Sequence, residues 1–236
     1  MRTRSVLLLL IFSSVMAVAA LANETRQKTT APQAKPPDLS TISVNGVGDI
    51  DPAKAFGSRD AVLVIEIFSD FQCPTCKQLY QATLTRVMDT YVSNTTACKI
   101  YVVHRDFPLP YHAYARTAAS YSRAAAHIGK CAEVETALFQ NQEKWEANGD
   151  VKAIVAAVLA PGEMKRVQTL VDSRTLEPLI DRDTQLGLTL PVHATPTMVI
   201  HTCDGHTYPI SGMVSYDVLN TFLDKLTRES SPSSAH

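Results

Sequence analysis

The alternation of apolar and polar positions predicts a few strands in the first half of the chain. Residues 61–68 are β-branched and apolar at odd and even positions alike, which is typical of a strand covered on both faces of a sheet. Shorter strands are predicted over residues 42–44 and 99–103, the second ending before His104. We therefore expect residues 61–68 to be the central strand, and residues 51–57 to form a loop with one helical turn.

Helical spacing begins after Cys76 and dominates the middle of the chain. One apolar stripe of the first helix is formed by Leu79, Ala82, Leu84, Val87, Met88 and Tyr91. Residues 111–187 are helical in pattern throughout, and their breaks delimit about five short helices. These breaks fall at Gly129, 148–150, 161–162, 172–175 and Gly187.

Strand character returns near the carboxyl end of the sequence. Residues 197–201 and 207–210 flank a turn and predict a hairpin. Ser215 then caps a last helix, whose apolar stripe contains Val218, Leu219, Phe222, Leu223 and Leu226. The order places a β-α-β half before the long helical segment and a β-β-α half after it. The chain is therefore of the α/β class.

The first residues have the pattern of a secretory signal. A basic head precedes an apolar run over residues 6–19, and Ala20-Leu21-Ala22 is a small-residue cleavage site, so we expect a signal peptide over residues 1–22. The alternative is an uncleaved membrane anchor, although this run falls short of the ~20 residues of a span. Residues 23–40 predict a flexible linker and residues 229–236 a disordered tail. We expect a periplasmic or otherwise exported protein.

Composition narrows the function further. The net charge is −1, with basic and acidic residues interspersed, so nothing indicates binding to nucleic acid. Five cysteines are too few for a disulfide scaffold in a chain of 236 residues. Cys98, Cys131 and Cys203 cannot all pair with one another. An extra disulfide among them would leave one free thiol, and we expect Cys131 to be a small core residue.

Cys73-Pro74-Thr75-Cys76 is the motif that carries chemistry. A Cys-x-x-Cys is a redox dithiol, half of a zinc site or a small structural disulfide. A second such motif or a His-x-x-x-His would favour a metal, and the sequence contains neither. We predict no metal and no cofactor, with a thioredoxin-like metal-binding module as the alternative from another class.

The position of the motif predicts unequal roles for the two thiols. Cys73 lies where a buried strand gives way to a helix, with Pro74 in the first turn, where its missing N–H costs nothing. The partial positive charge of a helix amino terminus favours a thiolate, so we expect Cys73 to be acidic and exposed. Cys76, one turn into the helix, is expected to be shielded and to resolve mixed disulfides.

Two distant motifs together carry a resemblance. The segment Phe68-Ser69-Asp70-Phe71-Gln72-Cys73-Pro74-Thr75-Cys76, combined with Ala194-Thr195-Pro196-Thr197, resembles the DsbA-like family of exported thiol-disulfide oxidoreductases. The resemblance implies a thioredoxin-like fold, a central mixed sheet flanked by helices, with an inserted all-helical domain. Its implied boundaries are 41–107 and 191–228 for the two halves of the thioredoxin fold and 108–190 for the inserted domain.

The resemblance also implies roles for residues outside the motif. Pro196 would follow a cis peptide bond and lie beside Cys73, so that Thr195 and Pro196 contact the substrate chain. The alternative is an ordinary proline at the start of a strand. Relatives carry an acidic residue six places before the first Cys, where this chain has Ile67. Glu66 is therefore a candidate proton acceptor for Cys76, or else a residue at a solvated edge.

The implied activity is donation of the Cys73–Cys76 disulfide to folding secreted proteins. A membrane quinone-linked thiol oxidase, of the DsbB or vitamin K epoxide reductase type, would recharge the pair. Pro74 and Thr75 would tune its redox potential, and Thr75 offers a hydroxyl where a His would add positive charge, which predicts a milder oxidant. A disulfide reductase or isomerase of the same fold is the alternative within the enzyme class.

Overall fold

The computed structural model describes residues 37, 39, 41–93 and 100–230. The predicted signal peptide, most of the predicted linker, Cys98 and residues 231–236 lie outside the described residues. Within the described part of the chain, none of the helices combines the length and the apolarity that crossing a membrane requires.

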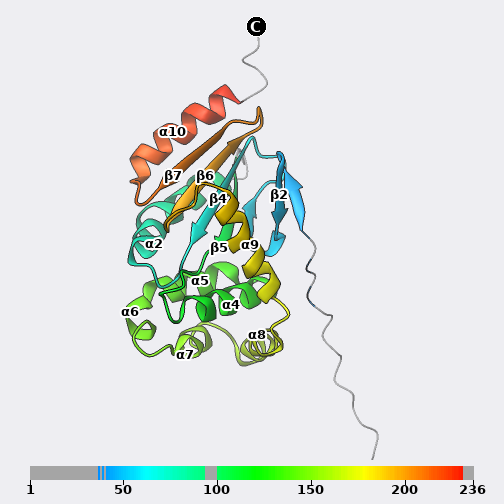
Figure 1. The fold of residues 1–236 in the computed structure, drawn as a ribbon, viewed down its shortest axis with the longest axis vertical. Helices are drawn as coiled ribbons and strands as arrows, with labels where there is room; N and C mark the ends of the chain where they lie inside the picture. The colour runs from blue at the N-terminus through cyan, green and yellow to red at the C-terminus, as the bar shows by residue number, and fades with distance from the viewer. Residues whose placement is uncertain (1–36, 38, 40, 94–99, 231–236) are drawn as a thin grey trace, which may run out of the picture. The chain divides into compact units, whose positions relative to one another are not determined.

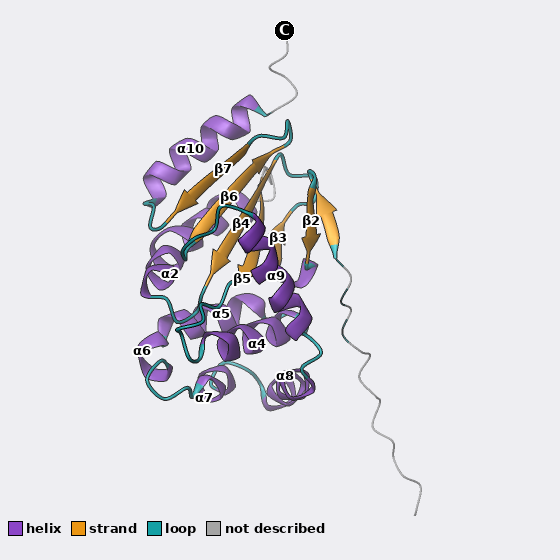
Figure 2. Ribbon diagram, viewed as in Figure 1, coloured by secondary structure: helices purple, strands orange, loops and turns teal. Residues whose placement is uncertain are grey.

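A five-stranded mixed sheet is the centre of the fold, with the strand order β3-β5-β4-β6-β7 (Figure 2). Its strands are β3 (Ala55–Gly57), β4 (Leu63–Ser69), β5 (Ile100–Asp106), β6 (Thr197–Thr202) and β7 (Thr207–Ser211). β4 pairs in parallel with β5 and antiparallel with β6, and its first six residues are buried. The predicted central strand is confirmed.

The strands near the amino end differ from the prediction. β1 (Ile42–Val44) pairs with β2 (Val47–Ile50) in a separate two-stranded sheet. The expected helical turn is present as a 3₁₀ turn over Pro52–Lys54, but β3 follows it and forms the edge of the main sheet beside β5. Three residues are too few to show a period of two, so the sequence pattern missed this strand.

The helix that follows the cysteine motif is interrupted by wider turns. It comprises α2 (Pro74–Leu79), the π-helical η2 (Tyr80–Leu84), α3 (Thr85–Val87) and the π-helical η3 (Met88–Val92). Such turns change the face on which later side chains lie. Ala82, which we expected in the apolar stripe, is exposed, whereas Leu79, Leu84 and Tyr91 are buried.

Six helices, rather than about five, occupy the described segment between β5 and β6. They are α4 (Ala115–Ala126), α5 (Cys131–Gln140), α6 (Gln142–Trp145), α7 (Val151–Ala156), α8 (Pro161–Ser173) and α9 (Glu177–Thr189). The break between α5 and α6 falls at Asn141, where no Gly or Pro signals it. α4 to α8 gather beyond the end of the sheet at which β4 and β5 end (Figure 1).

The two faces of the sheet carry different cores. Odd-numbered residues of β4, such as Ile65 and Ile67, pack with Leu79 of α2 and with Leu223 of the last helix, α10 (Tyr216–Glu229). The even-numbered Phe68 packs on the opposite face, in a cluster against which Leu186 and Leu190 near the end of α9 pack. The strand is thus covered on both sides, as its apolar pattern predicts.

Two details of the predicted helices are wrong. Val218, expected in the apolar stripe of α10, is 63% exposed, although Leu219 and Leu223 are buried as predicted. Gly187 does not end a helix but lies inside α9. A Cβ at this position would stand 2.5 Å from the Phe107 ring and 3.1 Å from the Phe68 ring. The glycine is present because α9 approaches these rings closely.

This close approach gives a test of the packing of α9. We expect Gly187→Ala to lower the free energy of unfolding by about 1–3 kcal/mol, because the methyl group overpacks the contact with Phe107 and Phe68. Gly162→Ala in α8 is the matched control, since a Cβ there meets nothing within 4 Å and alanine favours a helix by up to ~1 kcal/mol. Urea unfolding of both variants measures the difference. Equal free energies of unfolding for the two variants would contradict this close packing of α9.

Candidate active site

Cys73 lies at the boundary between the loop after β4 and the first turn of α2. Its backbone is extended, with φ −79° and ψ 121°, and Pro74 is the first helical residue. Cys73 therefore occupies the N-cap position, and the N–H of Lys77 donates to its carbonyl at 3.2 Å. This confirms the predicted placement of the motif at the start of a helix.

Asp70 fixes the loop that leads to the motif. Its carboxylate accepts hydrogen bonds from the N–H of Gln72 at 2.7 Å and from the N–H of Leu109 at 2.7 Å, and pairs with His112 at 2.8 Å. The side chain is 1% exposed. The bond to Gln72 is local, and an Asp two residues before it is a turn signal that the sequence offered. The contacts with the loop after β5 are not visible in the sequence.

A side chain of the helical segment also fixes this loop through hydrogen bonds. The buried side-chain amide of Gln142, at the start of α6, donates to the carbonyls of Phe71 at 2.6 Å and Cys73 at 3.1 Å. These carbonyls lie about seventy positions away in the sequence, so sequence reasoning missed Gln142. The helical segment therefore takes part in positioning the nucleophile.

The structure brings Thr195 and Pro196 next to the cysteine motif. The Thr195–Pro196 peptide bond is cis, as the resemblance implies. The Cys73 thiol donates to the carbonyl of Thr195 at 3.4 Å, across 122 positions of sequence. The N–H of Gly212 donates to the carbonyl of Pro196 at 2.8 Å, which ties this loop to the end of β7. Pro74 is exposed and Thr75 half-buried on the outer side of the motif.

The two thiols differ strongly in acidity. A hydrogen bond from the Cys76 thiol, aided by the backbone N–H groups of Cys76 and Thr75, lowers the pKa of Cys73 to about 5 although burial opposes the shift. Burial raises the pKa of Cys76 well above its ordinary value, and the neighbouring Cys73 raises it further. One expectation is wrong: Cys73 is not exposed, since only 7% of its surface is accessible, against 2% for Cys76.

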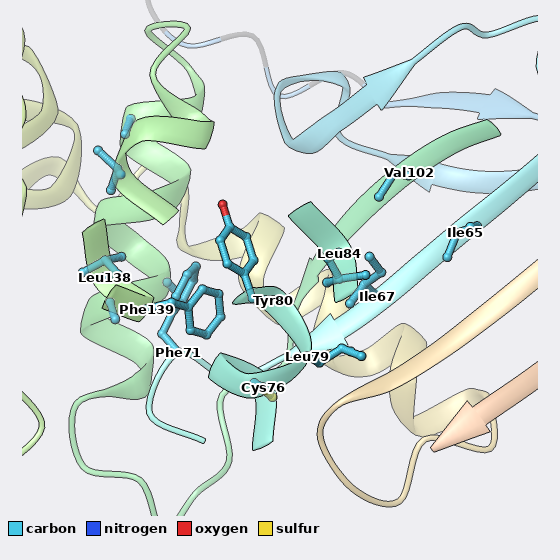
Figure 3. Packing of buried hydrophobic residues seen from close by; sticks show 14 of the residues in the cluster. Ile65, Ile67, Phe71, Cys76, Leu79, Tyr80, Leu84, Val102, Leu138 and Phe139 are labelled. Carbon is cyan, nitrogen blue, oxygen red and sulfur yellow. The ribbon is translucent and has the colours of Figure 1, made fainter. Parts of the chain in front are cut away.

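Glu66 points away from the dithiol. Its carboxylate is bound by Arg105 at 2.6 Å and by His201 at 2.8 Å. The neighbouring Ile67, on the opposite face of β4, packs in the same cluster as Cys76 (Figure 3). The placement argues against Glu66 as a proton acceptor for Cys76. It is a buried charge, 1% exposed, rather than a residue at a solvated edge.

The remaining cysteines and histidines do not form a metal centre in the described part of the chain. No group of three or more His, Cys, Asp and Glu side chains there has the arrangement of a metal site. Cys131 is buried at the start of α5, as expected of a small core residue, and Cys203 is exposed in the β6–β7 turn. Cys73 and Cys76 form a pair of unequal thiols beside the loop that carries Thr195 and Pro196.

Comparison with known proteins agrees with this geometry. Residues 51–225 match the thioredoxin family, and the chain belongs to that family. Its fold is the thioredoxin-like fold with extra helical elements, as predicted. No curated protein matches the sequence significantly.

Solved structures of DsbA type share the fold. Wolbachia pipientis alpha-DsbA1 is 19% identical, with 75% of this chain and 92% of that chain covered and a TM-score of 0.60. Oxidised BdbD from Bacillus subtilis is 17% identical, with 74% and 92% covered and a TM-score of 0.60. DsbA2 from Pseudomonas aeruginosa is 20% identical, with 78% and 97% covered and a TM-score of 0.53. The predicted resemblance is confirmed at the level of the fold.

The origin of the Cys73 acidity can be tested with two variants at one position. We expect Cys76→Ala to raise the pKa of Cys73 above about 5, because the Cys76 thiol is the largest stabilising influence on its thiolate. Cys76→Ser keeps a hydroxyl donor at the same place and should retain a lower pKa than the alanine variant. Thiolate absorbance against pH measures both. Identical values in the two variants would exclude the hydrogen bond as the cause.

Proposed function

We propose that the protein is an exported thiol-disulfide oxidoreductase that donates the Cys73–Cys76 disulfide to reduced secreted proteins. The observation that carries this proposal is the difference between the two thiols. The acidic Cys73 lies at a helix amino terminus against the Thr195 carbonyl, while Cys76 is shielded beneath it.

Exchange proceeds through one mixed disulfide. A substrate thiolate attacks the Cys73 sulfur of the oxidised pair, and the bond to Cys76 breaks as the bond to the substrate forms. A second substrate thiolate then attacks the substrate sulfur, and Cys73 leaves as a thiolate. The substrate forms a disulfide and loses two electrons, which the Cys73–Cys76 pair takes up.

The acidity of Cys73 sets the direction of this exchange. A pKa of about 5 stabilises the thiolate at pH 7 by roughly 3 kcal/mol relative to its protonated form, at 1.36 kcal/mol per unit. This stabilisation of the reduced form is fully present above the ordinary thiol pKa and is lost as pH falls through about 5. It corresponds to roughly 60 mV of oxidising power at pH 7, since 30 mV is about 1.4 kcal/mol for two electrons.

The surroundings of Cys73 fit an extended, partly apolar substrate. Tyr111 is 75% exposed in the loop that binds Asp70, and Met213 is 43% exposed directly after Gly212, which binds the Pro196 carbonyl. Unfolded chains present both backbone groups and apolar side chains. In this proposal Thr195 and Pro196 contact the substrate chain, with Thr195 as its backbone partner because the Pro196 carbonyl already accepts from Gly212, and the two exposed side chains supply apolar contact.

The sequence supports export, and recycling at a membrane is a further part of the same proposal. The basic head and apolar run within residues 1–22 fit a signal peptide. A quinone-linked thiol oxidase in the membrane would reoxidise the pair. The near-neutral net charge of −1 favours protein substrates over nucleic acid.

Recovery of ribonuclease activity tests the proposed function. We expect the oxidised protein to restore activity to reduced, unfolded ribonuclease A, because each exchange transfers one disulfide to the substrate. Cys73→Ser and Cys76→Ser should each abolish the recovery, because neither variant can hold the disulfide that is transferred. If the pair instead has a reducing potential and leaves ribonuclease inactive, the protein is a reductase or isomerase.

The redox potential depends on Thr75, according to this proposal. Equilibrium with glutathione buffers should give a potential more reducing than the about −120 mV of a strongly oxidising DsbA. Thr75→His should shift it towards oxidising values by roughly tens of millivolts, because a positive charge beside the Cys73 thiolate stabilises the reduced form. Gln78→His, at an exposed site of the same helix, is the control and should leave the potential unchanged. A wild-type value near −120 mV would refute the tuning role of Thr75.

A further inference from the structure

A small cavity lies beneath the resolving cysteine. Its lining includes Cys76, Lys54, His104 and Glu135 among apolar side chains such as Leu79. It leaves about 10 Å³ for the centre of a water-sized sphere, which is room for about one water molecule. The Cys76 thiol and a group of buried ionisable side chains therefore border the same cavity.

His104 faces this cavity because of the strand register. In the parallel pairing of β4 with β5, His104 stands opposite Ile67, on the sheet face that carries Cys76. Ile67 is apolar and exchanges no proton. His104 lines the cavity from the adjacent position and is the group there that can act as both acid and base near neutral pH.

Glu135 orients the His104 ring. Its carboxylate lies 2.5 Å from the His104 Nδ1 and 2.5 Å from the Lys54 ammonium, and the Ser122 hydroxyl donates to it at 3.2 Å. Burial raises the pKa of Glu135, but His104 and Lys54 outweigh it and hold the pKa well below its usual range. Glu135 therefore remains a carboxylate that accepts the Nδ1 proton, and the exchangeable position of the ring is Nε2.

The Nε2 atom of His104 is the ring nitrogen that does not pair with Glu135. It is buried, and it has no hydrogen-bond partner among the described residues. A groove of about 350 Å³ lies on the other side, lined by Phe56, Met88 and Asp89 together with His104 and Glu135. His104 lines both the cavity beneath Cys76 and this groove, so it connects the thiol with the surface at a place other than the opening beside Thr195.

We propose that His104, held by Glu135, exchanges the proton of Cys76 through one water molecule in this cavity. When a substrate thiolate attacks Cys73, Cys76 leaves as a thiolate with a high proton affinity. Protonated His104 gives its Nε2 proton to the water, which passes one to Cys76, and the ring regains a proton through the groove. In the reverse direction neutral His104 takes the Cys76 proton before Cys76 attacks the mixed disulfide. The inference rests on the proposed dithiol exchange.

Several charged and titratable groups surround His104. Glu135 on α5 and Lys54 in the 3₁₀ turn face it from one side, and Tyr80 lies on the other with its ring centroid 6.3 Å away. Arg105 and Asp106 on its own strand and Cys131 on α5 belong to the same cluster, and Asp89 lines the groove. The nearest of these groups to the ring is Glu135.

His104→Gln tests the proton exchange. Stopped-flow mixing of the oxidised protein with dithiothreitol, followed by the fluorescence of its single tryptophan, Trp145, gives the rate of attack on Cys73. We expect His104→Gln to lower this rate by about 10²-fold at pH 7, the lower range for general acid catalysis. The wild-type pH profile, corrected for the thiolate fraction of dithiothreitol, should contain an ionisation that the variant lacks. The pKa of Cys73 should be unchanged.

His201→Gln is the matched control. His201 also pairs with a buried carboxylate, Glu66, and is 15% exposed against 13% for His104, but it lies on the opposite sheet face. Equal rates of attack on Cys73 in the two variants would overturn the inference. A different result would overturn only the proposed direction of transfer: the wild-type protein does not restore ribonuclease activity, yet His104→Gln still lowers the rate.

A measurement on the wild-type protein covers the case in which His104→Gln does not fold. Nuclear magnetic resonance follows the His104 ring against pH in the disulfide and dithiol forms. Proton exchange with Cys76 requires the His104 titration midpoint to differ between the two forms, because coupling between the groups is reciprocal. A midpoint that is the same in both forms, while Cys73 titrates normally, would overturn the inference.

Discussion

A network of buried ion pairs joins the sheet to the helical segment, and the geometry of the active site depends on it. The cations are Lys54, Arg105 and Arg123, each no more than 1% exposed. They bind the carboxylates of Asp51, Glu66, Asp106, Glu135 and Asp183. Burial of these charges is costly, so each cation requires its partners, and loss of one partner would cost about 3–5 kcal/mol. The network therefore selects one arrangement of the elements that carry it.

This arrangement reaches the dithiol through two routes. Arg123 on α4 binds Asp106 at the end of β5, and the loop that follows β5 supplies the Leu109 N–H and His112 to Asp70. Glu135 fixes α5 beside the sheet, and α6 follows directly with Gln142, which binds the carbonyls of Phe71 and Cys73. Both routes end on the short loop between β4 and α2. The helical segment is thus a structural part of the active site.

The sequence predicts those features that arise from local pattern. β4 is apolar on both faces, and Cys73 followed by Pro74 marks a helix start, so the central strand and the place of the dithiol are visible without coordinates. The Thr195-Pro196 pair needed the resemblance to a family in addition. The pairing partners of Glu66 lie on β5 and β6, which no local pattern reveals. Its carboxylate proved to balance Arg105 rather than to serve Cys76.

The features that the sequence did not reveal depend on contacts between distant elements. Gly187 is explained by the Phe107 ring that packs against it, not by a helix end. β3 exists because β5 offers it a partner edge. The pairing of His104 with Glu135 joins a strand to a helix 31 positions later, and its place beside the Cys76 cavity follows from strand register. Hydrophobic periodicity carries no information about such pairs.

The contact between Cys73 and Thr195 also determines when the active site can form during synthesis. These residues are 122 positions apart, so at the ~5–20 residues per second of synthesis the nucleophile is made roughly 6–25 s before its partner loop. During that interval Cys73 lacks the Thr195 carbonyl, and its neighbouring loop lacks Gln142. The growing chain therefore carries both thiols before the loop that adjoins Cys73 has been made, and the complete site forms only when nearly the whole domain has been synthesised.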